Sequence, residues 1–177
     1  TPHMSSPLVD VVIPLYNKAE VVDRTVRSVL GQTFGDFRVI VVDDGSTDGG
    51  ADRVPRDPRI TLIHQNNAGP GAARNRGLRE SAAPFISFLD ADDEYYPGHI
   101  ERLLTVYAAR PEVDFVFCKC DLVNAAGGVA DNIKLPWEDK AGDFDCGLTF
   151  CRANFELRWM GSPTSAISVR RKLLGRI

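Results

Sequence analysis

Short apolar runs rich in β-branched residues alternate along this chain with segments whose apolar residues recur every three or four positions. The apolar runs predict strands at residues 8–15, 37–45, 60–65, 84–90 and 114–120, and the segments between several of them predict helices. A further strand that leads into a helix is predicted within residues 165–174. Strands that are almost continuously apolar and alternate with helices are typical of an α/β fold with a buried, mostly parallel sheet.

Local signals predict where the helices begin and end. Asn17 followed by Glu20 forms a capping-box pattern, which predicts that the first helix begins directly after Asn17. Gly31 suits the C-terminal end of that helix. Pro70 and Pro97 are expected at the starts of the next two helices, because the first helical position leaves its N–H unbonded and proline has none.

Polar and acidic residues follow three of the predicted strands. They are Pro14, Tyr16 and Asn17 after the first strand, Asp43, Asp44 and Ser46 after the second, and Asp90, Asp92 and Asp93 after the fourth. The carboxyl ends of parallel strands meet at one edge of a sheet, where open α/β sheets bind their ligands. The last three carboxylates repel one another, so a positively charged partner is expected beside them.

Composition narrows the classes of function. The chain has 177 residues, enough for one domain, and its formal net charge of -3 argues against a nucleic-acid partner. No window approaches the roughly 18 apolar residues of a membrane span, so no transmembrane segment is expected. The four cysteines lack the paired spacing of zinc ligands, which favours free thiols and a cytoplasmic location.

The first predicted strand is followed by PLYNKAEVVDRTV, which contains no glycine. This excludes a G-x-G-x-x-G dinucleotide loop at that position, and no P-loop occurs elsewhere in the chain. If a nucleoside diphosphate binds at the sheet edge, another group must neutralise its charge. Asp90 and Asp92 offer oxygen ligands for Mg²⁺ or Mn²⁺. An isolated D-x-D sequence is also typical of a solvated acidic turn, and that alternative stays open on the motif alone.

Four stretches together resemble the family 2 glycosyltransferases, which have the GT-A fold. They read VVIPLYNKAEVVDRTVRSVLGQTF, FRVIVVDDGSTDGG, NNAGPGAARNRGL and FISFLDADDEYYPGHIERL, and they cover roughly residues 8–110. The resemblance implies a Rossmann-like sheet flanked by helices and a metal-dependent, inverting transfer of a sugar. The implied donor is a nucleoside diphosphate sugar, with UDP favoured, and the implied acceptor is a hydroxyl of a saccharide or lipid-linked molecule. Surface polysaccharide or glycoconjugate synthesis is the expected setting.

The resemblance also implies roles for residues at the sheet edge. The residues implied to bind the nucleotide are Pro14, Tyr16, Asn17, Asp44, Gly69, Arg74, Asp90 and Ala91, and those implied to hold Mn²⁺ or Mg²⁺ are Asp92 and Asp90. Asp44 is expected to accept a hydrogen bond from the base, with a turn residue before Gly45 as its alternative. Arg74 is expected to face the base or the phosphates, with a surface helix arginine as its alternative. Asp93 is expected only to support its neighbours.

The chain departs from the family pattern at its C-terminal end. The family's catalytic base, an Asp or Glu, normally follows a segment resembling SPTSAISVRRKLLGRI, and the sequence ends at Ile177. The base is therefore expected beyond Ile177. Residues 1–7 are expected to be a leftover lead, 8–120 the nucleotide-sugar-binding core, and 121–177 the start of an acceptor-side region.

Two alternative functions remain open at this point. A non-catalytic nucleotide-binding module of the same fold would also lack the base. A phosphotransferase using the aspartates ranks last, because such enzymes place a nucleophilic Asp after the first strand, and here Pro14 to Tyr16 stand there. Peripheral association with the inner face of a membrane also stays open.

Overall fold

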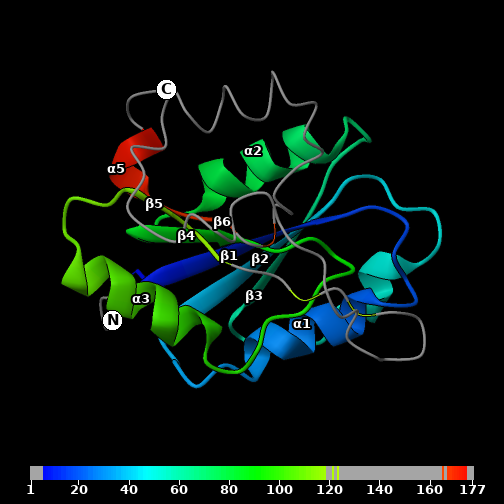
Figure 1. Cartoon of the computed structure of the whole chain (residues 1–177). Helices are drawn as coiled ribbons and strands as arrows, with labels where there is room; N and C mark the ends of the chain where they lie inside the picture. The colour runs from blue at the N-terminus through cyan, green and yellow to red at the C-terminus, as the bar shows by residue number, and fades with distance from the viewer. Residues whose placement is uncertain (1–5, 119–120, 122, 124–164, 166, 175–177) are drawn as a thin grey trace, which may run out of the picture.

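The computed structural model describes residues 6–118, 121, 123, 165 and 167–174. It shows a sheet with helices on both faces (Figure 1). In chain order the elements are β1 (Val9–Leu15), α1 (Val22–Leu30), β2 (Phe37–Asp43), the 3₁₀ helix η1 (Gly50–Arg53), β3 (Ile60–His64), α2 (Pro70–Glu80), β4 (Phe85–Phe88), α3 (His99–Ala109), β5 (Phe115–Phe117), β6 (Ile167–Arg170) and α5 (Arg171–Leu174).

The sheet has the strand order β3-β2-β1-β4-β6-β5. The strands β3, β2, β1 and β4 are parallel to one another, whereas β6 pairs antiparallel with both β4 and β5. This mostly parallel sheet between helices confirms the predicted fold class. The strand and helix predicted within 165–174 are confirmed as β6 and α5, while the predicted domain boundaries stay a prediction.

The capping-box prediction for the first helix is wrong. Helix α1 begins at Val22, its N-cap is Val21, and no side chain caps it. Asn17 instead has a positive φ of 50°, and its side-chain oxygen accepts a hydrogen bond from the Thr47 N–H at 2.9 Å. The prediction from the local pattern failed because the side-chain oxygen of Asn17 bonds to the Thr47 N–H, about thirty residues away, and not to the start of the helix. The predicted end of the helix at Gly31 is confirmed.

The other predicted boundaries hold within a few residues. Helix α2 begins at Pro70 as predicted, but α3 begins at His99 with Gly98 as its N-cap, so Pro97 lies just outside the helix. Strand β5 ends at Phe117, and residues 119–120 of the predicted strand lie outside the described residues.

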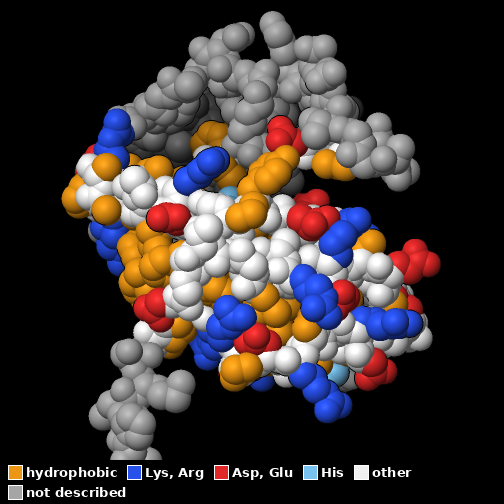
Figure 2. Space-filling model, turned by 90° about the horizontal axis from the view of Figure 1, so that it is seen from below, with side chains coloured by type: hydrophobic (Ala, Val, Ile, Leu, Met, Phe, Trp, Pro, Cys, Tyr) orange, Lys and Arg blue, Asp and Glu red, His pale blue; other side chains and the backbone are white. Residues whose placement is uncertain are grey.

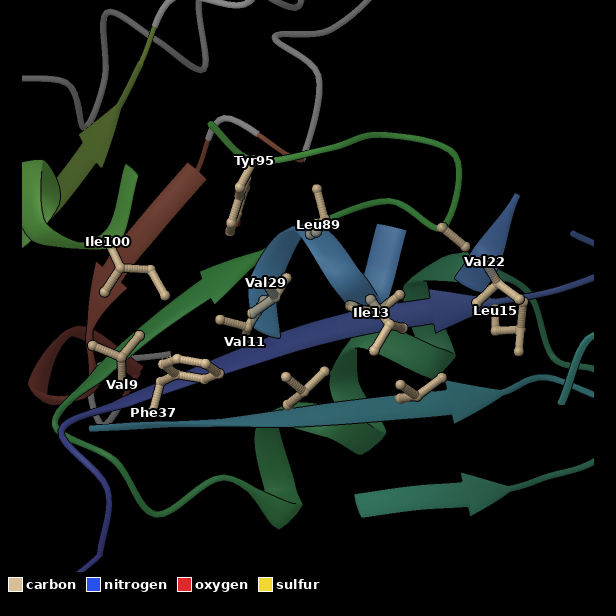
Figure 3. Close-up of a cluster of buried hydrophobic side chains, with 14 residues drawn as sticks. Val9, Val11, Ile13, Leu15, Val22, Val29, Phe37, Leu89, Tyr95 and Ile100 are labelled. Atoms are coloured by element: carbon tan, nitrogen blue, oxygen red, sulfur yellow. The ribbon is translucent and has the colours of Figure 1, made fainter. Parts of the chain in front are cut away.

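Two hydrophobic layers enclose the sheet. On one face Val11, Ile13 and Val39 pack against α1 and against Ile100 of α3 (Figure 3). On the other face Val12 packs with partly buried residues of α2 and α5. Alternate residues of β1 therefore enter different layers, which is why this strand is almost continuously apolar, with Asp10 as its one charged residue.

The surface over α1 and α3 carries no field of a single sign. Figure 2 shows acidic and basic side chains interspersed on this face, with hydrophobic side chains between them. Among the described residues, no helix has the length and apolar character needed to cross a membrane.

Helix α2 approaches β1 closely at a glycine. A Cβ added to Gly77 would stand 2.3 Å from a methyl carbon of Val12, which is fully buried. We expect Gly77→Ala to lower the free energy of unfolding by about 1–3 kcal/mol, because this packing cannot yield without moving backbone. Gly71→Ala in the same helix, where an added Cβ meets nothing within 4 Å, should be neutral or stabilising by about 0.5 kcal/mol. Urea denaturation measures both, and equal effects would contradict the close approach.

Candidate functional site

The carboxyl end of β1 extends beyond the strand beside it. Pairing of β1 with β4 ends at Val12 and Phe88, whereas pairing with β2 continues to Leu15. The Val12 carbonyl accepts from Leu89 on the β4 side and the Leu15 carbonyl accepts from Asp44 on the β2 side. Pro14 therefore faces the β4 side beyond the last pair, where its missing N–H breaks no sheet hydrogen bond.

The chain order reverses at this same place. The segment after β1 leads through α1 to β2 on one side, whereas β4 lies on the other side of β1. Such a switch point leaves the loops after the two strands free to diverge, and it is where open α/β sheets bind ligands. Tyr16, which follows β1, has 48% of its side chain exposed here.

Hydrogen bonds hold the loop after β1 against the loop after β2. The N–H of Asn17 donates to Ser46 Oγ at 3.1 Å, and Asn17 Oδ1 accepts from the Thr47 N–H. Two residues on, the N–H of Ala19 donates to Asp48 Oδ2 at 2.8 Å. These contacts give Asn17 a bracing role that positions Tyr16 and Lys18 on either side of it.

Asp44 is the centre of a second set of contacts. Its side chain is almost fully buried, at 2% exposure. Asp44 Oδ1 accepts from Gln65 Nε2 at 2.7 Å and from the Ala68 N–H at 2.9 Å, and Oδ2 accepts from the Gly69 N–H at 2.8 Å. Asp44 thus ties the segment that precedes α2 to the end of β2.

These donors set the charge state of Asp44. Burial alone raises the pKa of its carboxyl, but the hydrogen bonds from Gln65 and from the N–H groups of Ala68 and Gly69 outweigh burial and leave the pKa below its ordinary value. The neighbouring Asp43 stabilises the turn after β2, since its Oδ1 accepts from the Ser46 N–H at 3.0 Å.

Each aspartate in the loop after β4 has a different partner. Lys18 Nζ lies 2.6 Å from Asp92 Oδ2, and Arg74 of α2 donates to Asp90 Oδ1 at 2.5 Å. The expected positive partners are therefore supplied by the loop after β1 and by the first turns of α2. Side chains from three separate segments meet at the switch point.

Among the described residues, Asp93 forms no ion pair and bonds to a hydroxyl instead. Ser165 Oγ donates to Asp93 Oδ2 at 2.5 Å and accepts from the Asp90 N–H at 2.9 Å. Burial raises the pKa of the Asp93 carboxyl, and the charges of Asp92 and Asp90 raise it further. Asp93 therefore helps to hold the loop through Ser165, and its supporting role toward a ligand site stays a prediction.

The residue between the two candidate metal ligands holds the loop to α1. Ala91 is buried at 4% exposure, and its carbonyl accepts from Thr25 Oγ1 at 2.9 Å. The backbone of the loop is thereby fixed while Asp92 stays about half exposed. Contact of Ala91 with a nucleotide stays a prediction.

The donor set fits a hard divalent cation bound together with a phosphate ligand. Asp92 is exposed, has carboxylate oxygens, and is paired in the contacts above only with a partly exposed lysine side chain. Within the described ranges, no group of three or more His, Cys, Asp or Glu is arranged to hold a metal by itself. Mg²⁺ and Mn²⁺ often bind through one or two carboxylates and take further oxygen ligands from substrate phosphates. A cation bound at Asp92 would likewise take further oxygen ligands from a bound phosphate.

The structure brings the predicted residues to one edge of the sheet, but their functions toward a ligand stay predictions. Sequence reasoning missed Lys18, Thr25 and Ser165. Lys18 had a usable signal, since it follows the first predicted strand at the edge where the carboxylates were expected. Ser165 had none, because it lies more than seventy residues from both of its partners in the loop.

Structural comparison defines the class of protein. TarS from S. aureus, solved in complex with UDP-GlcNAc, matches 95% of this chain and 46% of that chain, with a TM-score of 0.70 and 22% sequence identity. The mannosyltransferase PcManGT from Pyrobaculum calidifontis, solved with GDP-Man and Mn²⁺, matches 66% of this chain and 36% of that chain, with a TM-score of 0.58 and 27% identity. The fold is that of the GT-A glycosyltransferases.

Sequence comparison identifies the family. The model of glycosyl transferase family 2 matches residues 10–154, and the chain belongs to that family. The glycosyltransferase YibD of Escherichia coli K12 is 36% identical over 121 residues, which are 66% of this chain and 35% of that protein. The chain thus spans about a third of the length of this curated relative.

Removing the Asp44 carboxylate should loosen the site without any ligand present. We expect Asp44→Ala to lower the free energy of unfolding by about 1–2 kcal/mol at neutral pH, because its N–H donors lose a charged acceptor. Since the folded-state pKa is lowered, the contribution is full above the unfolded-state value of 3.8 and is lost as the pH falls through the folded-state pKa.

Urea denaturation at neutral pH and at a pH below 3.8 measures this difference. Asp23→Ala is the matched control, because Asp23 lies on the surface of α1 in an exposed pair with Arg27 and should change stability by less than about 0.5 kcal/mol. If the stability advantage of wild type over Asp44→Ala grew as the pH fell, the lowered folded-state pKa of Asp44 would be contradicted.

Proposed function

We propose that this chain is the donor-binding part of a glycosyltransferase that moves a sugar from a nucleoside diphosphate to an acceptor hydroxyl with inversion. The observation that carries the proposal is the loop 90–93, whose carboxylates stand at the switch point with separate, mostly displaceable partners. An acidic loop braced in this way favours the binding of a cation together with a phosphate over the alternative of a solvated acidic turn.

The described residues divide the work of holding the donor. The exposed ring of Tyr16 offers a face on which a base can stack. Arg74 Nε is buried and has no hydrogen-bond partner among the described residues, so this guanidinium retains an unused donor beside Asp90. Asp44 holds the segment before α2 in place and is proposed to accept from the base as well.

A divalent cation held by Asp92, with Asp90 nearby, would supply the positive charge that stabilises the departing diphosphate. Asp93 and Ser165 keep the loop backbone in position, and Thr25 anchors the Ala91 carbonyl. Positioning by these contacts reduces the rearrangement that donor binding requires.

UDP is the proposed nucleotide. TarS was solved in complex with UDP, at 25% identity and a TM-score of 0.59 to this chain, whereas PcManGT was solved with GDP-Man and Mn²⁺. These likenesses support a nucleoside diphosphate sugar and Mn²⁺ or Mg²⁺, with UDP-sugars tested first and GDP-sugars second. A saccharide or lipid-linked acceptor and a cytoplasmic location, at the inner face of a membrane or free of it, remain part of the proposal.

The main alternative is a nucleotide-binding module that carries out no transfer. The base that activates the acceptor hydroxyl is proposed to lie beyond Ile177. A longer protein that contains this chain should therefore release UDP from a UDP-sugar in the presence of acceptor. Tight donor binding without any transfer in that longer protein would favour the module.

The binding test uses the chain itself. Isothermal titration calorimetry with UDP should show tighter binding with Mn²⁺ than with EDTA. Asp92→Asn should reduce the Mn²⁺-dependent gain by at least about tenfold, because one carboxylate ligand of the cation is lost. Asp23→Asn, on the exposed surface of α1, should keep the wild-type gain. UDP affinity that is the same with Mn²⁺ and with EDTA would contradict the role given to the cation.

A further inference from the structure

Lys18 forms an ion pair with Asp92, the carboxylate that the proposed cation would bind. Its ammonium nitrogen lies 2.6 Å from Asp92 Oδ2, and this hydrogen bond, together with the charges of Asp92, Asp93 and Asp90, raises the pKa of Lys18. A divalent cation that binds this oxygen cannot share it with an ammonium at contact distance, because the two positive charges repel.

The side chain of Lys18 is free to leave while its backbone stays in place. The Lys18 carbonyl accepts from the N–H groups of Val21 and Val22 at the start of α1. The side chains of Lys18 and Asp92 are 44% and 48% exposed. An ion pair this exposed is weak and is screened by salt, so it can open at little cost.

Once Lys18 is displaced, its ammonium lies beside the site and no longer pairs with the Asp92 carboxylate. Phosphate oxygens of a bound nucleotide would provide a new acceptor for that ammonium at the same edge of the sheet. The cation and the nucleotide would then favour each other's binding, since the nucleotide stabilises the lysine position that the cation requires.

We propose that Lys18 competes with the divalent cation for Asp92 and moves to the phosphates once the cation binds, so the cation binds productively only together with the nucleoside diphosphate. This inference rests on the proposed function, because it takes Asp92 as the ligand of the cation. Lys18 thereby sets the order of assembly at the site.

The first measurement is the affinity for Mn²⁺ alone, by electron paramagnetic resonance at low ionic strength. Lys18→Met should bind Mn²⁺ about three- to tenfold more tightly than wild type, with the difference shrinking as salt is added. Lys18→Arg keeps the positive charge and should stay close to wild type. Equal Mn²⁺ affinity in wild type and Lys18→Met would overturn the competition.

The matched control is Arg24→Met. Arg24 Nε lies 2.7 Å from Glu94 Oε1, so this variant removes an exposed positive charge near the same loop but not from Asp92. It should change the Mn²⁺ affinity less than about twofold. A gain as large as that of Lys18→Met would show a general effect of net charge and would overturn the proposal.

The second measurement is the affinity for UDP at a saturating Mn²⁺ concentration, where the cation holds Asp92 and Lys18 is displaced from it. Lys18→Met should bind UDP about three- to tenfold more weakly, because the phosphates lose a cationic partner. Unchanged UDP affinity would overturn the movement of Lys18 to the phosphates. The thermal midpoint of each variant without ligand verifies that the fold is intact.

One further variant separates this inference from the proposed function. Asp92→Asn should lose Mn²⁺ binding in both the wild-type and the Lys18→Met background. If Asp92→Asn binds Mn²⁺ as well as wild type does, the proposed metal role falls and this inference falls with it. If Asp92→Asn loses Mn²⁺ while Lys18→Met equals wild type, only the role of Lys18 is overturned.

Discussion

The parallel pairing of β1 with both β2 and β4 is the constraint on which the rest of this structure depends. Parallel strands must be covered on both faces, and their carboxyl ends all lie at the same edge of the sheet. Because β1 continues past its last pair with β4, the loops after these strands diverge at that edge. Hydrophobic packing thus decides where a polar site can form.

Polar contacts then hold loops that hydrophobic packing leaves free. Asn17 joins the loop after β1 to the loop after β2, and Asp44 joins the end of β2 to the start of α2. Thr25, which precedes the loop after β4 in the sequence, and Ser165, which follows it, both hydrogen-bond to the backbone of that loop. Since each bond links different elements, the loops are positioned together and the side chains between them can face a ligand.

The acidic loop shows how such a site tolerates like charges. Asp92 is exposed and pairs with a lysine, Asp90 pairs with a partly buried arginine, and Asp93 is satisfied by a hydroxyl. These partners differ in exposure and charge, so the three carboxylates are chemically distinct despite being close in sequence. The most exposed of the three pairs is the one that a cation and a phosphate would most easily replace.

The sequence by itself determined the alternation of strands and helices, the parallel sheet and the edge at which polar residues collect, because these follow from local periodicity and from the geometry of parallel strands. It also predicted that the carboxylates need positive partners. The partners themselves, Lys18 for Asp92 and Arg74 for Asp90, were decided by the tertiary structure. The same holds for Asn17, which has the local sequence of a helix cap but bonds to Thr47. A local pattern cannot show which distant group reaches a side chain first, because that depends on how the folded strands place their loops.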